Sequence, residues 1–170
     1  KKTKTEEIPK LTETSKPSES GKNNTIIVNP AKSVVKAGTR FSVSGQVYKV
    51  TKAGKEVSFI QAKKNAKRVV IPATVKSKGV TYKVTSVAAK AVKNNKKVKS
   101  VVIGANVKRI SNNAFYKCKS LKTVTIKSVL LTKKTANKKA FKGVGKKMVI
   151  KVPKKMKKSY ARIFRGLAIR

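Results

Sequence analysis

The sequence contains no aspartate, no histidine and no tryptophan, and only five acidic residues among its 170. Without His or Asp, the usual ligands of catalytic zinc and of calcium are missing, and so is the base of a His-dependent triad. Paired-carboxylate catalysis is nearly excluded as well, because Glu56 is the only acid beyond the first 20 residues. The composition argues against a conventional enzyme, and we expect neither a metal nor a cofactor.

Cysteine and long apolar runs are also scarce. The single cysteine, Cys118, cannot form an internal disulfide. No run of about 18 apolar residues occurs, so no membrane-spanning helix is expected. The chain begins at Lys1 rather than Met. We therefore expect a processed chain or a piece of a longer one, from which any signal segment has been removed.

Positive charge is what the sequence has in excess. Its 45 Lys and Arg residues give a formal net charge of +40, and only six of them are Arg. Such a chain attracts polyanions, which include nucleic acid, wall polymers, acidic glycans and anionic membranes. Few Arg side chains and no interleaved aromatics argue against specific nucleic-acid recognition. The alternative is that Lys serves only to keep the surface soluble.

The N-terminal third predicts a polar linker followed by strands. Residues 1–24 are rich in Lys, Thr, Glu, Ser and Pro, which is typical of a disordered arm. Alternating apolar residues over Phe41–Val50, interrupted by Ser44-Gly45, predict a hairpin, and Glu56–Ile60 predicts another strand. We expect a β-rich N-terminal cap over residues 25–66.

Internal repetition is the most informative feature. The segment Gly45–Thr51 matches Gly79–Thr85, and Val69–Val75 matches Val101–Val107. A shorter period of 23 residues is shared by several further pairs. They are Ala91-Val92 with Ala114-Phe115, Val98 with Leu121, Val101 with Val124, and Ile103 with Ile126. A third Ala-Phe pair follows at Ala140-Phe141. A period of this length indicates stacked repeats that share one core.

The repeat predicts which side chains point inward. In Leu121–Ile126 the apolar residues should face the core, while Lys122, Thr123 and Thr125 should face out. Val107 and Ile110 should line a second side. Near the C-terminus, Met148–Val152 predicts a strand, and Pro153 introduces an amphipathic helix over Lys154–Phe164 that Gly166 ends.

The segment Asn113–Ile126, with Ala-Phe, then Cys, then Leu-x-x-Val-x-Ile, resembles the BspA-like leucine-rich repeat. The resemblance covers about Lys67–Pro153 and implies a leucine-rich-repeat fold of mainly β or α/β class. We expect a short right-handed solenoid with repeats over 67–152, the hairpin-rich cap over 25–66 and a C-terminal capping helix over 153–170. The copy at Ala91-Val92 departs from the pattern, because Val92 and Asn95 stand where Phe and Cys are expected.

The resemblance implies a bacterial surface or secreted protein that works in adhesion, without catalytic residues. The expected partner is a host or bacterial surface macromolecule, with an anionic polymer among the candidates, and a monomer is favoured. Outward alternation alone selects the candidate ligand-binding residues, which are Lys99, Ser100, Val102, Lys122, Thr123 and Thr125. The alternatives are a spacer held to anionic wall polymer by its charge and a nonspecific nucleic-acid binder.

Three local motifs resemble functional signatures, but each has a simpler explanation. Ser33-x-x-Lys36 fits the spacing of a serine acyl-enzyme, but the companion motifs are absent. Gly143-Val-Gly-Lys146 lacks the first glycine and the hydroxyl residue of a phosphate loop, so a turn is expected. The lysine-rich run Lys154–Lys158 could lie on an anionic membrane, although a capping helix with a solvated face explains it.

Single residues allow two interpretations as well. Cys118, between Lys117 and Lys119, could be a reactive thiol. The repeat frame predicts instead a small buried residue. Tyr48, Tyr82 and Tyr116 could be exposed ligand platforms, but the first two occupy equivalent positions in matching segments, which favours the core.

Overall fold

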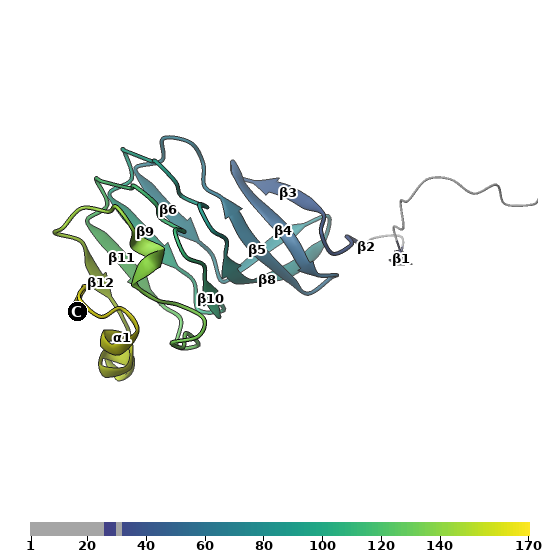
Figure 1. Ribbon diagram of the computed structural model, residues 1–170. Helices are drawn as coiled ribbons and strands as arrows, with labels where there is room; N and C mark the ends of the chain where they lie inside the picture. Colours follow the sequence, from purple (N-terminus) through teal and green to yellow (C-terminus); the bar gives the residue numbers. More distant parts are fainter. Residues whose placement is uncertain (1–25, 30–31) are drawn as a thin grey trace, which may run out of the picture.

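The computed structural model describes residues 26–29 and 32–170, so the predicted linker over 1–24 lies outside the described residues. The described chain is built mostly of strands, which form two main sheets and one small antiparallel ladder (Figure 1). The ladder joins β1 (Ile26–Asn29) to β2 (Lys32–Val34). The two main sheets supply the inward side chains of one apolar core.

The first main sheet contains the hairpins near the N-terminus. Its strands are β3 (Arg40–Val43), β4 (Gln46–Lys52), β5 (Glu56–Gln61), β8 (Val80–Val87) and β10 (Arg109–Ile110), with β7 (Thr74–Ser77) paired to β8. β3 and β4 are antiparallel, as are β7 and β8, whereas β8 runs parallel to both β5 and β10. The hairpin predicted over Phe41–Val50 and the one around Gly79 are both confirmed.

The sequence explains the tight turns of these hairpins. Ser44 and Gly45 have φ values of 52° and 76°, and Lys78 and Gly79 have 48° and 74°. Two consecutive positive φ values define the type I′ turn, whose twist suits a two-residue hairpin. Glycine adopts this conformation without steric cost, which explains why Gly is the second turn residue in both hairpins.

The second main sheet takes one strand from each repeat. Its strands are β6 (Arg68–Ile71), β9 (Ser100–Ile103), β11 (Thr123–Ile126), β12 (Val149–Lys151) and β13 (Ala168–Ile169), all parallel. Val101 pairs with Val69 on one side and Val124 on the other. The spacings of 32 and 23 residues that relate these positions in the sequence are therefore the sheet register. β13 was not predicted.

Buried side chains follow the frame that the repeat predicted. Leu121, Val124 and Ile126 are at most 1% exposed, and Val107 and Ile110 are buried on the second side. The corner phenylalanines stack along the repeats: the Phe115 and Phe141 rings lie 5.2 Å apart and nearly parallel. Phe164 continues the column with an edge contact to Phe141 at 5.7 Å. The core is thus continuous from one repeat to the next.

The corners between the sheets are joined by backbone hydrogen bonds along the repeats. The Asn94 N–H donates to Tyr116 O, and the Lys117 N–H donates to Lys142 O. Asn94, Lys117 and Gly143 take equivalent places and all have positive φ, at 54°, 55° and 77°. The corner therefore requires a left-handed residue in each copy, and glycine meets that requirement in one of them.

The helices are short and lie toward the C-terminus. η1 (Lys138–Phe141) forms a corner, and η2 (Lys154–Met156) leads into α1 (Lys157–Ile163). The helix predicted over Lys154–Phe164 is present, although its first turn is a 3₁₀ helix. Tyr160 and Phe164 turn into the core. None of the helices in the described part of the chain has both the length and the apolar character needed to cross a bilayer.

Candidate functional site

The six residues predicted to bind ligand lie on β9 and β11 or directly before these strands. Parallel pairing sets Ser100 beside Thr123 and Val102 beside Thr125, about 4.8 Å apart along the sheet. All four side chains are partly exposed on the outward face, between buried neighbours. The structure therefore brings these four together as one small patch on adjacent strands.

The two predicted lysines lie at the rim of the sheet rather than on its face. The Lys99 N–H donates to Lys67 O at 2.7 Å, and the Lys122 N–H donates to Lys99 O at 2.9 Å. Lys67, Lys99 and Lys122 thus occupy one position in three successive repeats, and all three are exposed. Sequence reasoning missed Lys67, although the match between Val69–Val75 and Val101–Val107 carries the register that places it.

The rest of the outward face is small and partly apolar. Val70 on β6 is 42% exposed, and Val149 on β12 is half-buried beside Thr123. A shallow groove of about 310 Å³ lies where β11 and β12 end, lined by Thr125, Ile126, Lys127, Lys151, Val152 and Pro153. Thr125 therefore belongs both to the patch and to the groove. This combination suits a ligand that lies flat across the strands.

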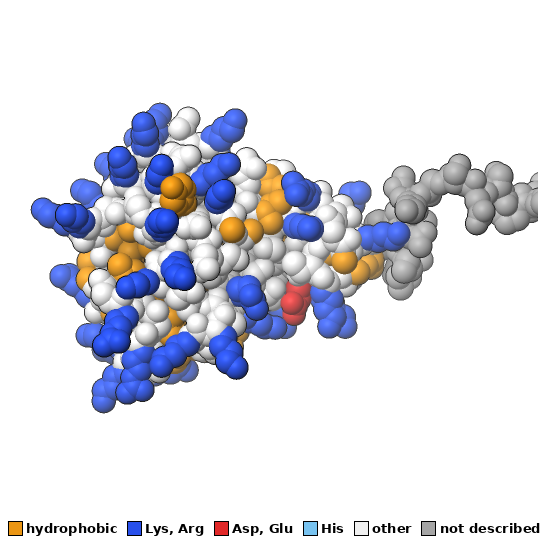
Figure 2. Space-filling model, viewed as in Figure 1, with side chains coloured by type: hydrophobic (Ala, Val, Ile, Leu, Met, Phe, Trp, Pro, Cys, Tyr) orange, Lys and Arg blue, Asp and Glu red, His pale blue; other side chains and the backbone are white. Residues whose placement is uncertain are grey.

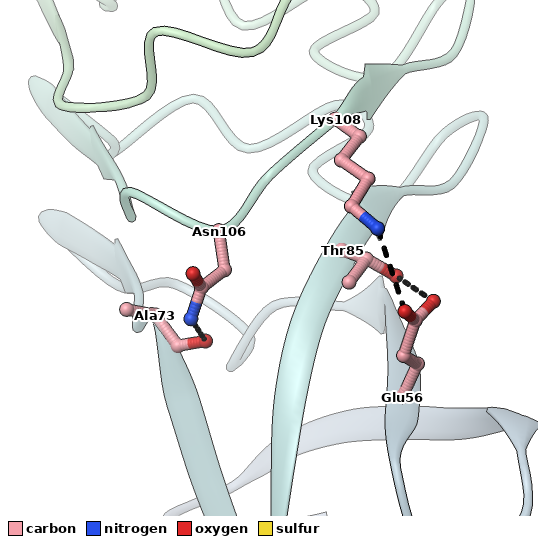
Figure 3. Close-up of polar contacts among 5 residues, drawn as sticks. All are labelled: Glu56, Ala73, Thr85, Asn106 and Lys108. Atoms are coloured by element: carbon pink, nitrogen blue, oxygen red, sulfur yellow. Dashed lines mark hydrogen bonds and ion pairs between the residues drawn. The ribbon is translucent and has the colours of Figure 1, made fainter.

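Only one acidic side chain is present in the described part of the chain, and it is already engaged. Glu56 on β5 accepts a hydrogen bond from the Thr85 hydroxyl at 3.3 Å and pairs with the Lys108 ammonium at 3.4 Å (Figure 3). Figure 2 shows Lys and Arg side chains spread over the visible face, with a single acidic side chain among them. Positive charge therefore dominates this face.

Cys118 and two tyrosines lie in the core. Cys118 is buried, its thiol donates to Val92 O, and burial raises its pKa despite a hydrogen bond from the Asn95 backbone. The reactive-thiol interpretation is therefore wrong, since reactivity requires a lowered pKa and access. Tyr48 and Tyr82 are at most 1% exposed, as predicted, while Tyr116 is partly exposed.

The catalytic motifs find no support. The side chain of Ser33 lies outside the described residues, so the spacing Ser33-x-x-Lys36 stays without a structural counterpart. The segment Gly143–Lys146 lies in the turns between η1 and β12, and a side chain at Gly145 would approach Lys119 O within 2.7 Å. Among the described residues, no three His, Cys, Asp or Glu side chains gather as a metal site would require.

One parallel strand per repeat, a shared core and a column of corner phenylalanines define a repeat protein of leucine-rich type. The profile of the family described as "BspA type Leucine rich repeat region" matches six copies over residues 58–170. The chain therefore belongs to this family, as its resemblance predicted. No curated protein matches the sequence.

Solved structures are similar to the chain at low identity. A leucine-rich repeat protein from Bacteroides capillosus is 15% identical, with a TM-score of 0.50 over 77% of this chain and 98% of that chain. A leucine rich cell surface protein from Faecalibacterium prausnitzii is 22% identical, with a TM-score of 0.49 over 70% of this chain. The match spans 38% of that protein's length. Pneumococcal vaccine antigen PcpA is 17% identical, with a TM-score of 0.46, and the match covers 70% of this chain and 33% of PcpA. The likeness to the Bacteroides capillosus protein shows a common fold.

Proposed function

We propose that the chain is a non-enzymatic binding module of a bacterial surface or secreted protein, and that it works in adhesion. Membership in the BspA-type family supports this proposal, because repeat proteins of this kind present extended surfaces rather than catalytic pockets. The observation that carries it is the register of β9 and β11, which sets Ser100 beside Thr123 and Val102 beside Thr125. Sequence-distant residues thereby form one contiguous outward patch.

The ligand would lie across the strands and contact the patch with its flat side. Hydroxyls of Ser100, Thr123 and Thr125 offer hydrogen bonds, and Val102 offers an apolar contact between them. The rim lysines Lys99 and Lys122 would then meet any acidic group at the ligand's edge. A host matrix protein, a glycan or another cell surface offers such a face, and an extracellular or cell-surface location is part of this proposal.

The proposal includes the shape of the molecule. We infer that the repeats stack as a short right-handed solenoid over 67–152, between a hairpin-rich cap over 25–66 and a C-terminal cap over 153–170. Burial of Tyr160 and Phe164 supports the C-terminal cap, since these side chains extend the core at its last repeat. The proposal favours a monomer, because exposed lysines discourage pairing of sheet edges.

A substitution on the patch tests the proposal without changing the charge. Thr125→Tyr would fill the patch and its groove, whereas Thr81→Tyr places the same side chain at an exposed position of β8 in the other sheet. The full chain and both variants are assayed against fibronectin, mucin, heparin, teichoic acid and DNA at about 0.15 M and about 0.5 M salt. One ligand that persists at high salt and is lost only in Thr125→Tyr supports the proposal.

The second candidate is a wall-associated spacer held by charge, and the net charge of +40 favours it. A spacer of this kind binds every polyanion alike and releases all of them in salt. Equal binding of all anionic ligands at low salt, with none left at high salt, would reject the patch in favour of this candidate. Nonspecific nucleic-acid binding would appear as DNA affinity above that of other polyanions.

A further inference from the structure

A row of residues lies in register across the outward face of the first main sheet. The Cα partners run from Arg40 on β3 to Lys49 on β4, Ser58 on β5, Ser86 on β8 and Arg109 on β10. Neighbouring strands are about 4.8 Å apart, so the row places two serines between cationic residues. Residues from position 40 to position 109 contribute to it, which no local sequence pattern could indicate.

The cations of this row have no carboxylate to pair with. Arg40 and Lys49 lie directly opposite each other on antiparallel strands, an arrangement in which like charges repel. Glu56 is the only acidic residue within the described part of the chain, and it is engaged by Lys108 and Thr85. An anion placed between Arg40 and Lys49 would replace their repulsion by two attractions.

Four residues of the row line a cleft of about 880 Å³, and Arg109 lies outside it. These four are Arg40, Lys49, Ser58 and Ser86, and the other lining residues include Thr51 and Gln61 with the small residues Ala37, Gly38 and Ala88. Ser58 is only 8% exposed, yet its hydroxyl makes a single long hydrogen bond of 3.5 Å to Ser86 O. The buried hydroxyl therefore retains capacity for a stronger partner in the cleft.

A second cleft continues the first. It has a volume of about 590 Å³ and shares Ile60, Gln61 and Ala89 with the larger one. Its other polar lining residues are Lys63, Lys64, Asn65, Lys90, Lys93, Asn94 and Asn95. The two clefts thus form one path over the junction between the N-terminal hairpins and the first corner. Each cleft combines cationic side chains with amide or hydroxyl groups.

We propose that this double cleft binds a linear anionic glycan, whose oxyanions pair with the cations while its sugar hydroxyls bond to Ser, Thr, Asn and Gln. No aromatic residue lines either cleft, so the stacking platforms that single-stranded nucleic acids require are missing. The site lies on the first main sheet and not on the patch of β9 and β11. It therefore goes beyond the adhesion function proposed above, and it can be tested independently of that proposal.

Matched variants of the full chain distinguish specific binding in the cleft from nonspecific binding through the net positive charge. Arg40→Gln with Lys49→Gln removes two charges from the cleft, and Lys154→Gln with Lys155→Gln removes two from the exposed η2, outside both clefts. Ala89→Phe keeps the charge and obstructs the place where the clefts join. A heparin oligosaccharide, wall teichoic acid and polygalacturonate are titrated separately, with single-stranded DNA as the comparison. These probes distinguish sulfate, phosphate and carboxylate as the anionic group.

The expected result is about tenfold weaker binding of at least one glycan to the Arg40/Lys49 variant and to Ala89→Phe, with less than about a twofold change for the Lys154/Lys155 variant. Circular dichroism checks that each variant is folded. Equal weakening by both double variants would overturn the proposal, because bulk charge would then account for binding. So would the absence of glycan binding to the unaltered chain, or DNA binding that is tighter and lost in the same variants. Thr125→Tyr should leave glycan binding in the cleft unchanged. The experiments can therefore reject the cleft proposal and the patch proposal separately.

Discussion

The hydroxyl of Tyr160 donates a hydrogen bond to the carbonyl oxygen of Ser128 at 2.7 Å. The same hydroxyl accepts a hydrogen bond from the Leu131 N–H at 3.3 Å, and the Ser128 side chain donates in turn to Val107 O. α1 is thereby tied to the loop that follows β11, and through it to the second side of the preceding repeat. A polar network of this kind gives the C-terminal helix one fixed position on the core.

Tyr160→Phe should destabilise the protein by about 1–3 kcal/mol, because it leaves the buried Ser128 carbonyl and Leu131 N–H without their shared partner. Tyr82→Phe is the matched control. The Tyr82 hydroxyl is buried and has no hydrogen-bond partner within the described residues, so its removal should be neutral or stabilising. Urea unfolding of both variants measures the difference. An equal loss of stability in the two variants would contradict the prediction that the Tyr160 hydrogen bonds stabilise the protein.

Gly104→Ala should destabilise the protein because two repeats approach each other closely at this position. A Cβ at Gly104 would lie 2.5 Å from Ala73 N and 2.6 Å from Pro72 C, which are backbone atoms that cannot move aside easily. Overpacking of this kind costs about 1–3 kcal/mol. Gly166→Ala serves as the comparison, since its Cβ meets nothing within 4 Å and only its positive φ is strained. Denaturant midpoints should fall further for Gly104→Ala than for Gly166→Ala.

Tyr48 should make stability fall at alkaline pH. Burial raises the pKa of Tyr48 from 10.0 to about 12, so in that interval the folded state keeps a proton that the unfolded chain releases. The unfolded state then binds fewer protons, and the free energy of unfolding decreases as pH rises from 10 toward 12. In Tyr48→Phe this contribution is absent, so its stability should fall less steeply. The two proteins differ only at this residue, so parallel curves of stability against pH would contradict the prediction.

The fold could be predicted from the sequence wherever residues repeat at a fixed spacing. Val101 and Val124 occupy equivalent positions in two repeats, and they are paired in the sheet. The glycines of the two hairpin turns mark the turns in the sequence. β13 could not be predicted, because two residues after a helix carry no periodic pattern and become a strand only by pairing with β12.

One of the two candidate sites could be predicted from the sequence and the other could not. The patch of β9 and β11 is predictable, because inward and outward residues alternate within each repeat. The double cleft could not be predicted. The pairing of β5 with β8 changes register after Val57, and this irregularity sets Ser58 opposite Ser86. A bulge of this kind depends on three-dimensional packing rather than on a local sequence signal. The number of charges could not locate the cleft either, because Lys and Arg side chains are scattered over the visible face rather than gathered in one place (Figure 2).

Lys117→Gly should stabilise the protein, although it removes a side chain from the surface. Lys117 has a φ of 55°, in the left-handed region that costs a residue with a Cβ about 1–2 kcal/mol, and the equivalent corner residue of the next repeat is already Gly143. Glycine costs about 0.5–1 kcal/mol in chain entropy, so the net gain should be at most about 1 kcal/mol. Loss of the contact between the Lys117 ammonium and the Tyr116 ring at 5.2 Å reduces it further. Lys119→Gly is the control, because Lys119 is exposed without a positive φ, and extra chain freedom should destabilise it. Thermal and urea unfolding measure the change in stability of both variants. If the corner requires a left-handed residue, Lys117→Gly should raise the free energy of unfolding and Lys119→Gly should lower it. Destabilisation of similar size in both would show that the corner tolerates lysine without strain.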